Sequence, residues 1–288
     1  MKRKVSLVLS SGGSRGLAHI GVINELERQR FEISSVAGSS IGAVIGGLHA
    51  MGKLHEYAEW VKPMNSQVIW GLLDFALSTS GLLKGEKVFN KMKAFIPDMI
   101  IEEMDTPFVA VATDLLNEKA VIFNTGSFYE AIRASVSIPG IFTPVMYNVV
   151  MLVDGGVLSP VPIEHVVRLN DDILVVVNLY GDKKVELEKA SLSNNDQDAT
   201  KINGLMKYIT KSGGSGNKGG LGYYAMLTTT SAAMLHKIAR QNIEKHRPDI
   251  LINIPTDSAN TFDFHKAEEL IKIGKLAAKE AILKYLNS

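Results

Sequence analysis

The sequence predicts an α/β protein with three layers, in which helices cover both faces of a central, mainly parallel sheet. Short apolar runs typical of buried strands alternate with amphipathic, helix-like stretches along the chain. The chain also opens in the order strand, glycine-rich loop, helix, strand, helix, as parallel strands joined by helical crossovers do. With 288 residues, of which 46% are hydrophobic, it can bury the core that such a fold requires.

The first strands and helices can be placed from the spacing of apolar residues. Residues 5–9 predict the first strand, and residues 11–16 form the glycine-rich loop after it. The next apolar residues recur every three positions, as in an amphipathic helix: Leu17, Ile20, Ile23 and Leu26. A second strand near 34–37 and a helix of small residues over about 41–51 follow, and we expect the two strands to be parallel.

The rest of the chain continues the pattern and contains one interruption. Further strands are predicted at 108–112, 120–123, 149–153, 173–178 and 250–254. An apolar stripe predicts a closing helix over about 264–286. Between about Gly181 and Gly222 the composition shifts to Ser, Asn, Asp, Lys and Gly, which predicts a flexible insertion or lid. We predict a single domain over 1–288 that carries this insertion.

Composition excludes several kinds of chemistry and of binding partner. The net charge of +1 provides no electrostatic footprint for nucleic acid, and it does not indicate an oligomeric state. The absence of cysteine excludes disulfides, thiolate metal sites and a thiol nucleophile. No metal-binding pattern is complete. The apolar run after Lys4 is too short for an export signal, and no run is long enough to span a bilayer, so we expect a cytoplasmic protein.

Residues 38–42 read GSSIG, the G-x-S-x-G pattern of a serine-hydrolase nucleophile elbow. The pattern follows a strand-like run and precedes a helix, so a tight turn would project the Ser40 hydroxyl toward the helix N-terminus. Gly38 and Gly42 would allow the close backbone approach that such a turn needs. The pattern therefore predicts Ser40 as a nucleophile.

The loop after the first strand is the candidate oxyanion hole. Because parallel strands end at the same sheet edge, this loop should lie beside Ser40. The backbone amides of Gly12, Gly13 and Ser14 could then face a carbonyl held at Ser40, and Gly16 keeps the loop slim. A dinucleotide-binding loop is the alternative, but its fingerprint requires glycine where Ser11 stands.

Arg15 lies at a helix N-terminus, where a cation opposes the helix dipole. One hypothesis is that Arg15 braces the glycine loop or meets a substrate phosphate. The other is a solvated surface side chain.

Asp154 is the candidate base. It follows the apolar run 149–153 and precedes Gly155 and Gly156, so a carboxylate would stand at the end of a buried strand beside a flexible turn. An Asp-Gly pair between apolar runs is also typical of a hairpin turn. A serine triad is a further alternative, because four histidines follow Asp154 in the order that α/β-hydrolases use: His165, His236, His246 and His265.

Taken together, the motifs resemble the patatin-like phospholipase family. That family combines a glycine-rich loop containing arginine, a G-x-S-x-G elbow and a later D-G-G. This chain has GGSRG at 12–16, GSSIG at 38–42 and DGG at 154–156, and ASVSIPG at 134–140 is similar to the family's loop before the aspartate. Ser11 departs from the pattern, because the family's glycine run usually begins at that position.

The resemblance implies a specific chemistry. Ser40 and Asp154 would form a catalytic dyad without histidine, metal or cofactor, and the substrate would be a lipid or another acyl ester. Transient contact with a membrane surface is a further expectation. A carboxylesterase or acyl-thioesterase with the same dyad, and a catalytically idle lipid-binding protein, stay open as alternatives.

Residues 68–77 form a dense apolar patch broken only by Gly71 and Asp74. Core packing is the simpler interpretation. The functional hypothesis is an acyl-chain groove or an interface-touching cap near Ser40, because a lipase must accommodate a hydrocarbon tail.

Overall fold

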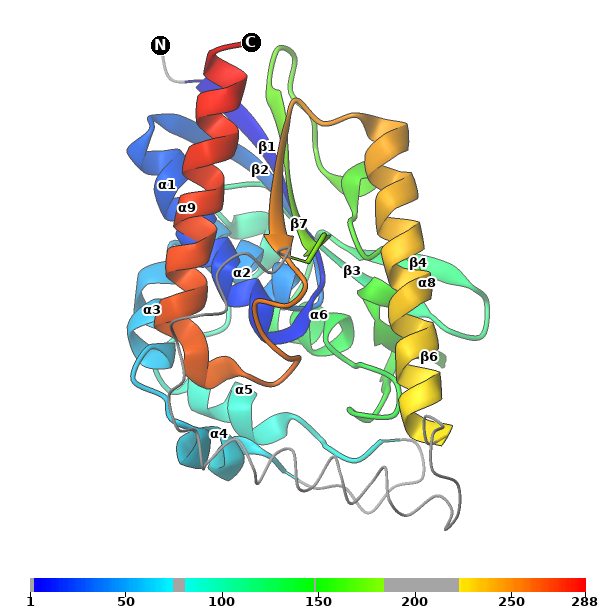
Figure 1. The fold of residues 1–288 in the computed structure, drawn as a ribbon. Helices are drawn as coiled ribbons and strands as arrows, with labels where there is room; N and C mark the ends of the chain where they lie inside the picture. The colour runs from blue at the N-terminus through cyan, green and yellow to red at the C-terminus, as the bar shows by residue number, and fades with distance from the viewer. Residues whose placement is uncertain (1–2, 75–80, 148, 184–222) are drawn as a thin grey trace, which may run out of the picture.

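The computed structural model describes residues 3–74, 81–147, 149–183 and 223–288, which build an eight-stranded sheet with helices on both faces (Figure 1). The strand order is β5-β6-β3-β2-β1-β7-β8, and β4 pairs with β3. The strands are β1 (Arg3–Leu9), β2 (Phe31–Ser39), β3 (Phe108–Asp114), β4 (Lys119–Phe123), β5 (Val145–Tyr147), β6 (Val150–Asp154), β7 (Ile173–Gly181) and β8 (Ile250–Pro255). The pairs β1–β2, β1–β7, β2–β3 and β7–β8 are parallel, which confirms the predicted α/β class with a mainly parallel sheet.

Alternating side chains divide the sheet between two apolar layers. Leu7 and Leu9 of β1 belong to the larger cluster, and Val8 between them belongs to the smaller one, as the period of two in a strand requires. The larger layer is covered by α1 (Ala18–Arg28), α2 (Ile41–Ala50), α6 (Phe128–Ser135) and α9 (Ala267–Leu286). The smaller layer is covered by residues 161–166 and by α8 (Tyr223–His246), which stands apart from α9 in Figure 1.

The edge of β3 positions the two halves of the site. Residues 108–111 of β3 pair with β2 in parallel, so that Ser39 lies opposite Val111. Residues 112–114 pair with β6 in the antiparallel sense, so that Asp154 lies opposite Ala112. Because β4 occupies the other edge of β3 over 110–114, β2 and β6 share one edge and meet end to end. The carboxyl ends of the two strands therefore become neighbours.

Several sequence-based boundaries are corrected by the structure. Strand β5 was not predicted, and Val149 lies in the turn before β6 with a φ of 64°. The closing helix α9 begins at Ala267, after a short 3₁₀ turn over Phe264–Lys266. The predicted insertion falls almost entirely on 184–222, outside the described residues. Three short helices between β2 and β3 complete the cover near the site: α3 (Leu54–Val61), α4 (Ser66–Leu72) and α5 (Glu86–Lys93).

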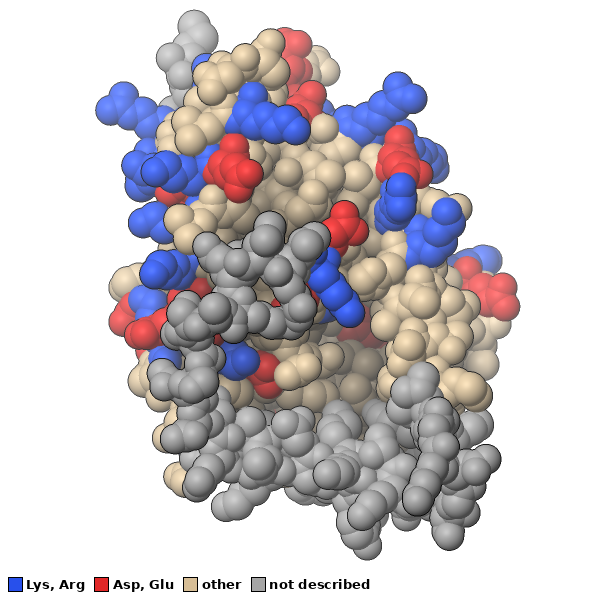
Figure 2. Space-filling model, viewed as in Figure 1, with Lys and Arg blue, Asp and Glu red and all other residues tan. Residues whose placement is uncertain are grey.

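Charged side chains of both signs are interspersed over the face drawn in Figure 2. Among the helices of the described residues, none is long and apolar enough to cross a membrane.

Candidate active site

Ser40 occupies a strained turn between β2 and α2. Its backbone has a φ of 55° and a ψ of −125°, a conformation that L-residues rarely adopt. The flanking glycines make this turn feasible. A Cβ at Gly38 would lie 2.3 Å from the carbonyl oxygen of Gly42, and one at Gly42 would lie 2.2 Å from that of Leu9. The sequence therefore folds into the sharp strand-to-helix turn that the G-x-S-x-G pattern predicts.

Asp154 ends β6 directly beside this turn. Its Oδ2 atom lies 2.5 Å from the Ser40 Oγ atom, and its Oδ1 atom accepts a hydrogen bond of 2.7 Å from the Gly156 N–H. Glycine is needed next in the chain, because a Cβ at Gly155 would lie 2.0 Å from the carbonyl oxygen of Val111. The structure thus brings together the two side chains predicted to form the dyad, from positions 114 residues apart.

The environment of Asp154 is almost free of compensating charge. The residue is 5% exposed, and among the described residues no lysine or arginine forms an ion pair with it. Burial raises the pKa of Asp154 to about 7, although the hydrogen bonds from Ser40 and Gly156 oppose the shift. A carboxyl group that titrates near neutral pH can both accept and return a proton at physiological pH.

The glycine-rich loop lies beside the serine, as the topology predicts. Gly13 lines the same cavity as Ser40 and has a φ of 61°. Among the described residues, the N–H groups of Gly12 and Gly13 form no hydrogen bond, whereas the N–H of Ser14 donates to the Thr261 carbonyl at 2.9 Å. Two of the three predicted oxyanion donors are therefore unoccupied, and the third is already used.

A loop from the C-terminal part of the chain supports the glycine loop. No sequence motif predicted this contact. Residues 256–264 connect β8 to α9. Asn260 accepts a hydrogen bond of 2.6 Å from the Ser14 hydroxyl through its carbonyl oxygen, and Thr256 accepts one of 2.8 Å from the Arg15 Nη1 atom. Gly16 leaves room for the side chain of Ile41, which would lie 2.3 Å from a Cβ there.

Arg15 is half-buried and not freely solvated. Its Nε atom is buried without a hydrogen-bond partner, and among the described residues it forms no ion pair. Burial lowers the pKa of Arg15, and nearby Tyr180 opposes the shift. Ser11, the departure from the family pattern, places its hydroxyl 2.5 Å from that of Tyr180.

The histidines take no part in the site as the structure shows it. All seven lie in described parts of the chain, and none forms a hydrogen bond with Ser40 or Asp154. His165 and His246 face Glu164, and His236 makes an edge-to-face contact with the ring of Tyr180. His19 is buried beside the Ser10 carbonyl, and its burial lowers the pKa to about 4, so it is a neutral packing residue.

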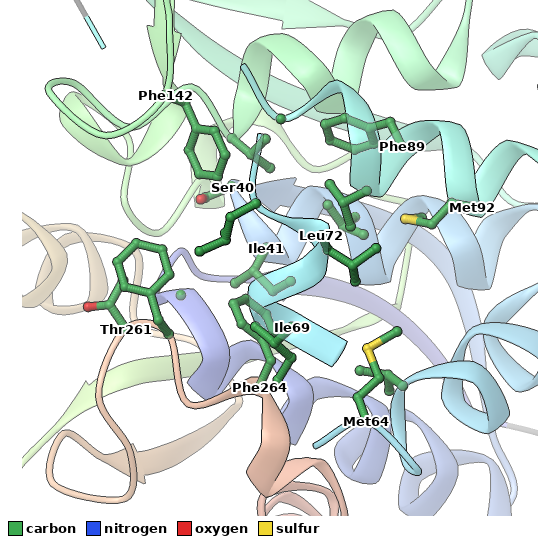
Figure 3. A pocket seen from close by; sticks show the side chains of 18 of the residues that line it. Ser40, Ile41, Met64, Ile69, Leu72, Phe89, Met92, Phe142, Thr261 and Phe264 are labelled. Atoms are coloured by element: carbon green, nitrogen blue, oxygen red, sulfur yellow. The ribbon is translucent and has the colours of Figure 1, made fainter. Parts of the chain in front are cut away.

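An apolar cavity of about 160 Å³ opens beside the nucleophile (Figure 3). In Figure 3, Ser40 and Phe142 lie at one end of the cavity, while Met64 and Met92 lie away from them. The predicted apolar patch contributes Ile69, Leu72 and Leu73 to the lining. Val68 of the same helix does not line the cavity and is 47% exposed. Residues 75–77 of the patch lie outside the described residues.

Comparison with known proteins identifies the class to which this fold and site belong. The family model described as patatin-like phospholipase matches residues 7–167, which is more than half of the chain. The chain belongs to the patatin-like phospholipase family, and membership indicates a hydrolase that acts on lipid esters.

Individual relatives agree with this assignment. An uncharacterized NTE family protein of Mycobacterium tuberculosis is 30% identical, over 97% of this chain and 91% of the relative. The lysophospholipase NTE1 of Meyerozyma guilliermondii is 26% identical over 99% of this chain, which corresponds to 20% of that larger protein.

Proposed function

We propose that the protein is a lipid acyl hydrolase, a phospholipase A-type esterase that works through a Ser40–Asp154 dyad. The observation that carries the proposal is the contact of 2.5 Å between Ser40 Oγ and Asp154 Oδ2 beside an apolar cavity. A strained turn places Ser40 at the cavity, and a buried carboxylate with a pKa of about 7 can take the proton of its hydroxyl.

The reaction proceeds in two steps. Ser40 Oγ attacks the acyl carbonyl while its proton passes to Asp154, and Asp154 returns that proton to the departing alcohol. Asp154 then takes a proton from water, which attacks the acyl-serine ester. Collapse of the second tetrahedral intermediate restores the Ser40 hydroxyl and releases the fatty acid.

The oxyanion formed in both steps needs hydrogen-bond donors. We assign this role to the N–H groups of Gly12 and Gly13, because neither has a hydrogen-bond partner among the residues that the structure describes, and not to Ser14, whose N–H donates to the Thr261 carbonyl. Each donor of this kind typically contributes about 3 kcal/mol to transition-state stabilisation.

Arg15 serves the same loop in this proposal. The hydrogen bond from Arg15 to the Thr256 carbonyl braces the loop. The guanidinium forms no ion pair among the described residues, so its charge is available for a substrate phosphate. Full turnover of phospholipid by Arg15→Ala would contradict this role.

The decisive comparison uses wild type, Ser40→Ala and Asp154→Asn on long-chain phospholipid without added calcium. We expect both variants to be folded and nearly inactive. A panel of phospholipid, acyl-thioester and short ester substrates distinguishes the lipase from a thioesterase or carboxylesterase. An idle lipid-binding protein would hydrolyse none of them, and its Ser40 would not react with a fluorophosphonate.

The cavity can be tested on helix α4. Leu72→Asp places a charge in the lining, so we expect kcat/KM for long-chain esters to fall while short-chain esters are spared. Val68→Asp is the matched control, because Val68 belongs to the same helix but is exposed and does not line the cavity. Equal losses on long and short esters for Leu72→Asp would contradict an acyl-chain site.

Membrane contact and a cytoplasmic location stay predictions.

A further inference from the structure

The last residue of α6 and the turn after it contact the main chain of both dyad residues. The hydroxyl of Ser135 accepts a hydrogen bond of 2.9 Å from the Ser40 N–H. Two residues later, the carbonyl oxygen of Ser137 accepts one of 3.0 Å from the Asp154 N–H. One short segment thus holds two backbone positions that arrive from different strands.

The roles of the two partners of Ser135 are fixed by chemistry. Its hydroxyl also lies 2.6 Å from the carbonyl oxygen of Val111, which can only accept, so the single hydroxyl proton must point there. The Ser40 N–H can only donate, so it meets a lone pair of the same oxygen. Ser135 is 0% exposed, so water does not compete for either bond.

This bridge lies where β2 and β6 meet on β3. Val111 lies opposite Ser39 in the register, and the next residue of β3 lies opposite Asp154. Ser135 therefore ties the residue after β2 to the strand that fixes the position of β6. The pairing of β2 with β3 ends at Ser39, so no strand neighbour restrains the strained backbone of Ser40. The hydrogen bond to Ser135 supplies that restraint.

We propose that Ser135 is a positioning residue for the reaction, which directs the Ser40 hydroxyl at Asp154 by restraining the backbone of the elbow. The proposal rests on the proposed function of the dyad. It also explains why the oxyanion donors come from the glycine loop, since the Ser40 N–H is committed to Ser135.

The test compares Ser135→Ala with Ser35→Ala, a matched control. Ser35 is also buried and also donates its hydroxyl to a backbone carbonyl, that of Val167, but it lies five residues before Ser40 on β2, about 16 Å along a strand. We expect both variants to lose similar thermal stability. Only Ser135→Ala should lose kcat, by about 100-fold with KM unchanged, and its Ser40 should react more slowly with a fluorophosphonate by a similar factor.

A second variant, Ser135→Cys, keeps a weak donor and acceptor at this position and covers the case in which Ser135→Ala does not fold. We expect its kcat to fall between those of wild type and Ser135→Ala, or clearly below wild type if only the cysteine variant folds. Wild-type kcat in a folded Ser135→Ala or Ser135→Cys protein, with Ser40→Ala inactive, would overturn the positioning role alone. Activity in Ser40→Ala would instead overturn the proposed function.

Discussion

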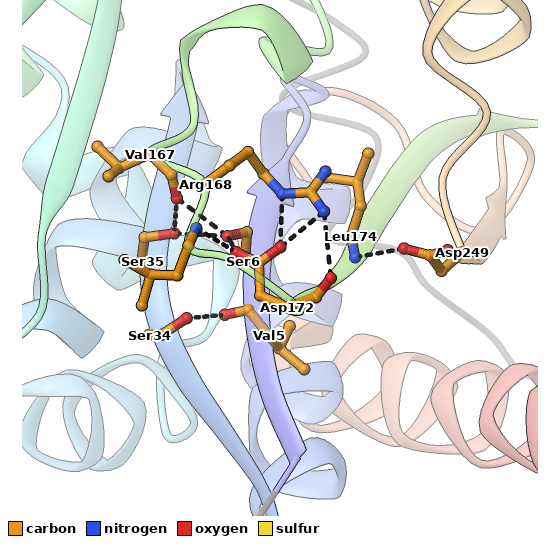
Figure 4. A network of polar contacts seen from close by, with 10 residues as sticks. Val5, Ser6, Ser34, Ser35, Val167, Arg168, Asp172, Leu174 and Asp249 are labelled. Carbon is orange, nitrogen blue, oxygen red and sulfur yellow. Dashed lines mark hydrogen bonds and ion pairs between the residues drawn. The ribbon is translucent and has the colours of Figure 1, made fainter.

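The described part of the chain contains two buried Ser–Asp pairs, and only one of them has the surroundings of a catalytic site. Ser40 meets Asp154 at the carboxyl ends of β2 and β6. Ser6 of β1 meets Asp172 in a polar cluster elsewhere on the sheet, which Figure 4 shows with Arg168 and Ser35 around it. In both pairs the hydroxyl of the serine is hydrogen-bonded to the Oδ2 atom of the aspartate.

The two carboxylates differ in their other partners. Asp172 also accepts a hydrogen bond of 2.8 Å from the Leu169 N–H and one of 2.6 Å from the Arg168 Nε atom. Burial alone would raise the pKa of Asp172, but the Ser6 hydroxyl, the Leu169 N–H and the Arg168 guanidinium together lower it. Asp154 forms no ion pair within the described parts of the chain, and burial raises its pKa to about 7. Asp172 is thus held as a stable carboxylate that is a poor base at neutral pH.

The serines differ as well. Ser6 lies within a strand, fully buried, and its hydroxyl oxygen also lies 2.9 Å from the Val167 carbonyl oxygen. Ser40 lies in a strained turn that opens onto an apolar cavity lined also by Gly13. The comparison teaches that a serine beside an aspartate is not a nucleophile by itself. The absence of an ion pair among the described residues, the strained turn and the adjacent cavity distinguish the candidate site.

Removing each serine hydroxyl should give the largest contrast. We expect Ser40→Ala to lower kcat on a lipid ester by about 10⁴-fold or more, because the nucleophile is lost. Ser6→Ala should keep the wild-type kcat in the folded fraction, since Ser6 touches no part of the site. Steady-state kinetics on both variants, with circular dichroism to confirm folding, checks the contrast. Comparable kcat losses in the two variants would break it.

The pH dependence of the reaction should follow Asp154. Only the deprotonated carboxylate can take the serine proton, so kcat/KM should rise with pH up to about 7 and level off above it. Below that midpoint kcat/KM should fall about tenfold for each unit by which the pH is lowered, as for any single essential base. A flat profile between pH 5 and 8, measured with a non-ionising ester, would show that Asp154 is not the base.

The ion-paired carboxylate should matter for stability instead. Asp172→Asn weakens charge-assisted bonds from Ser6, Leu169 and Arg168, so we expect the free energy of unfolding at pH 7 to fall by about 2 kcal/mol. The kcat of the folded protein should be unchanged. Denaturant titration measures the free energy of unfolding. An unaltered midpoint for Asp172→Asn would contradict the structural role of the cluster.

The smallest expected effect is an opposite pH trend of stability in the two aspartate variants. The pKa of Asp154 is higher in the folded protein than in the unfolded chain, so burial of its charge costs stability as pH rises from about 4 to about 7. We expect Asp154→Asn to be more stable than wild type at pH 8, with a smaller difference near pH 4.

The pKa of Asp172 shifts on folding in the opposite direction to that of Asp154. Its pKa is lowered on folding, so its contribution is present above about pH 4, the unfolded value, and is lost as pH falls through the folded value. The deficit of Asp172→Asn should therefore shrink in acid. Thermal melts at pH 8, at pH 4 and at lower pH values compare the two variants over both ranges, and the same trend in both would contradict the comparison.

The sequence allowed some of this to be foreseen. The turn at Ser40 and the residues around Asp154 could be predicted, because glycine spacing reports local backbone geometry directly. The parallel core strands could be predicted from continuous apolar runs. The apolar patch over 68–77 was recognised, but helix α4 was not predicted there, and the apolar run did not reveal that Val68 is exposed while Leu72 lines the cavity.

Other features depend on tertiary contacts that leave no local signal. The end-to-end meeting of β2 and β6 follows from the register on β3, which a list of strands does not contain. The support of Ser14 by Asn260 joins residues 246 positions apart. The contact between Ser6 and Asp172 spans 166 positions without any motif.

The central claim is that Asp154, and not Asp172, activates a serine. The most direct measurement is the rate at which a fluorophosphonate modifies Ser40 at pH 8, followed by mass spectrometry in wild type, Asp154→Asn and Asp172→Asn. We predict equal rates for wild type and Asp172→Asn, and a rate lower by about 10³-fold or more for Asp154→Asn. Modification of Ser40 at the wild-type rate in folded Asp154→Asn would contradict the account.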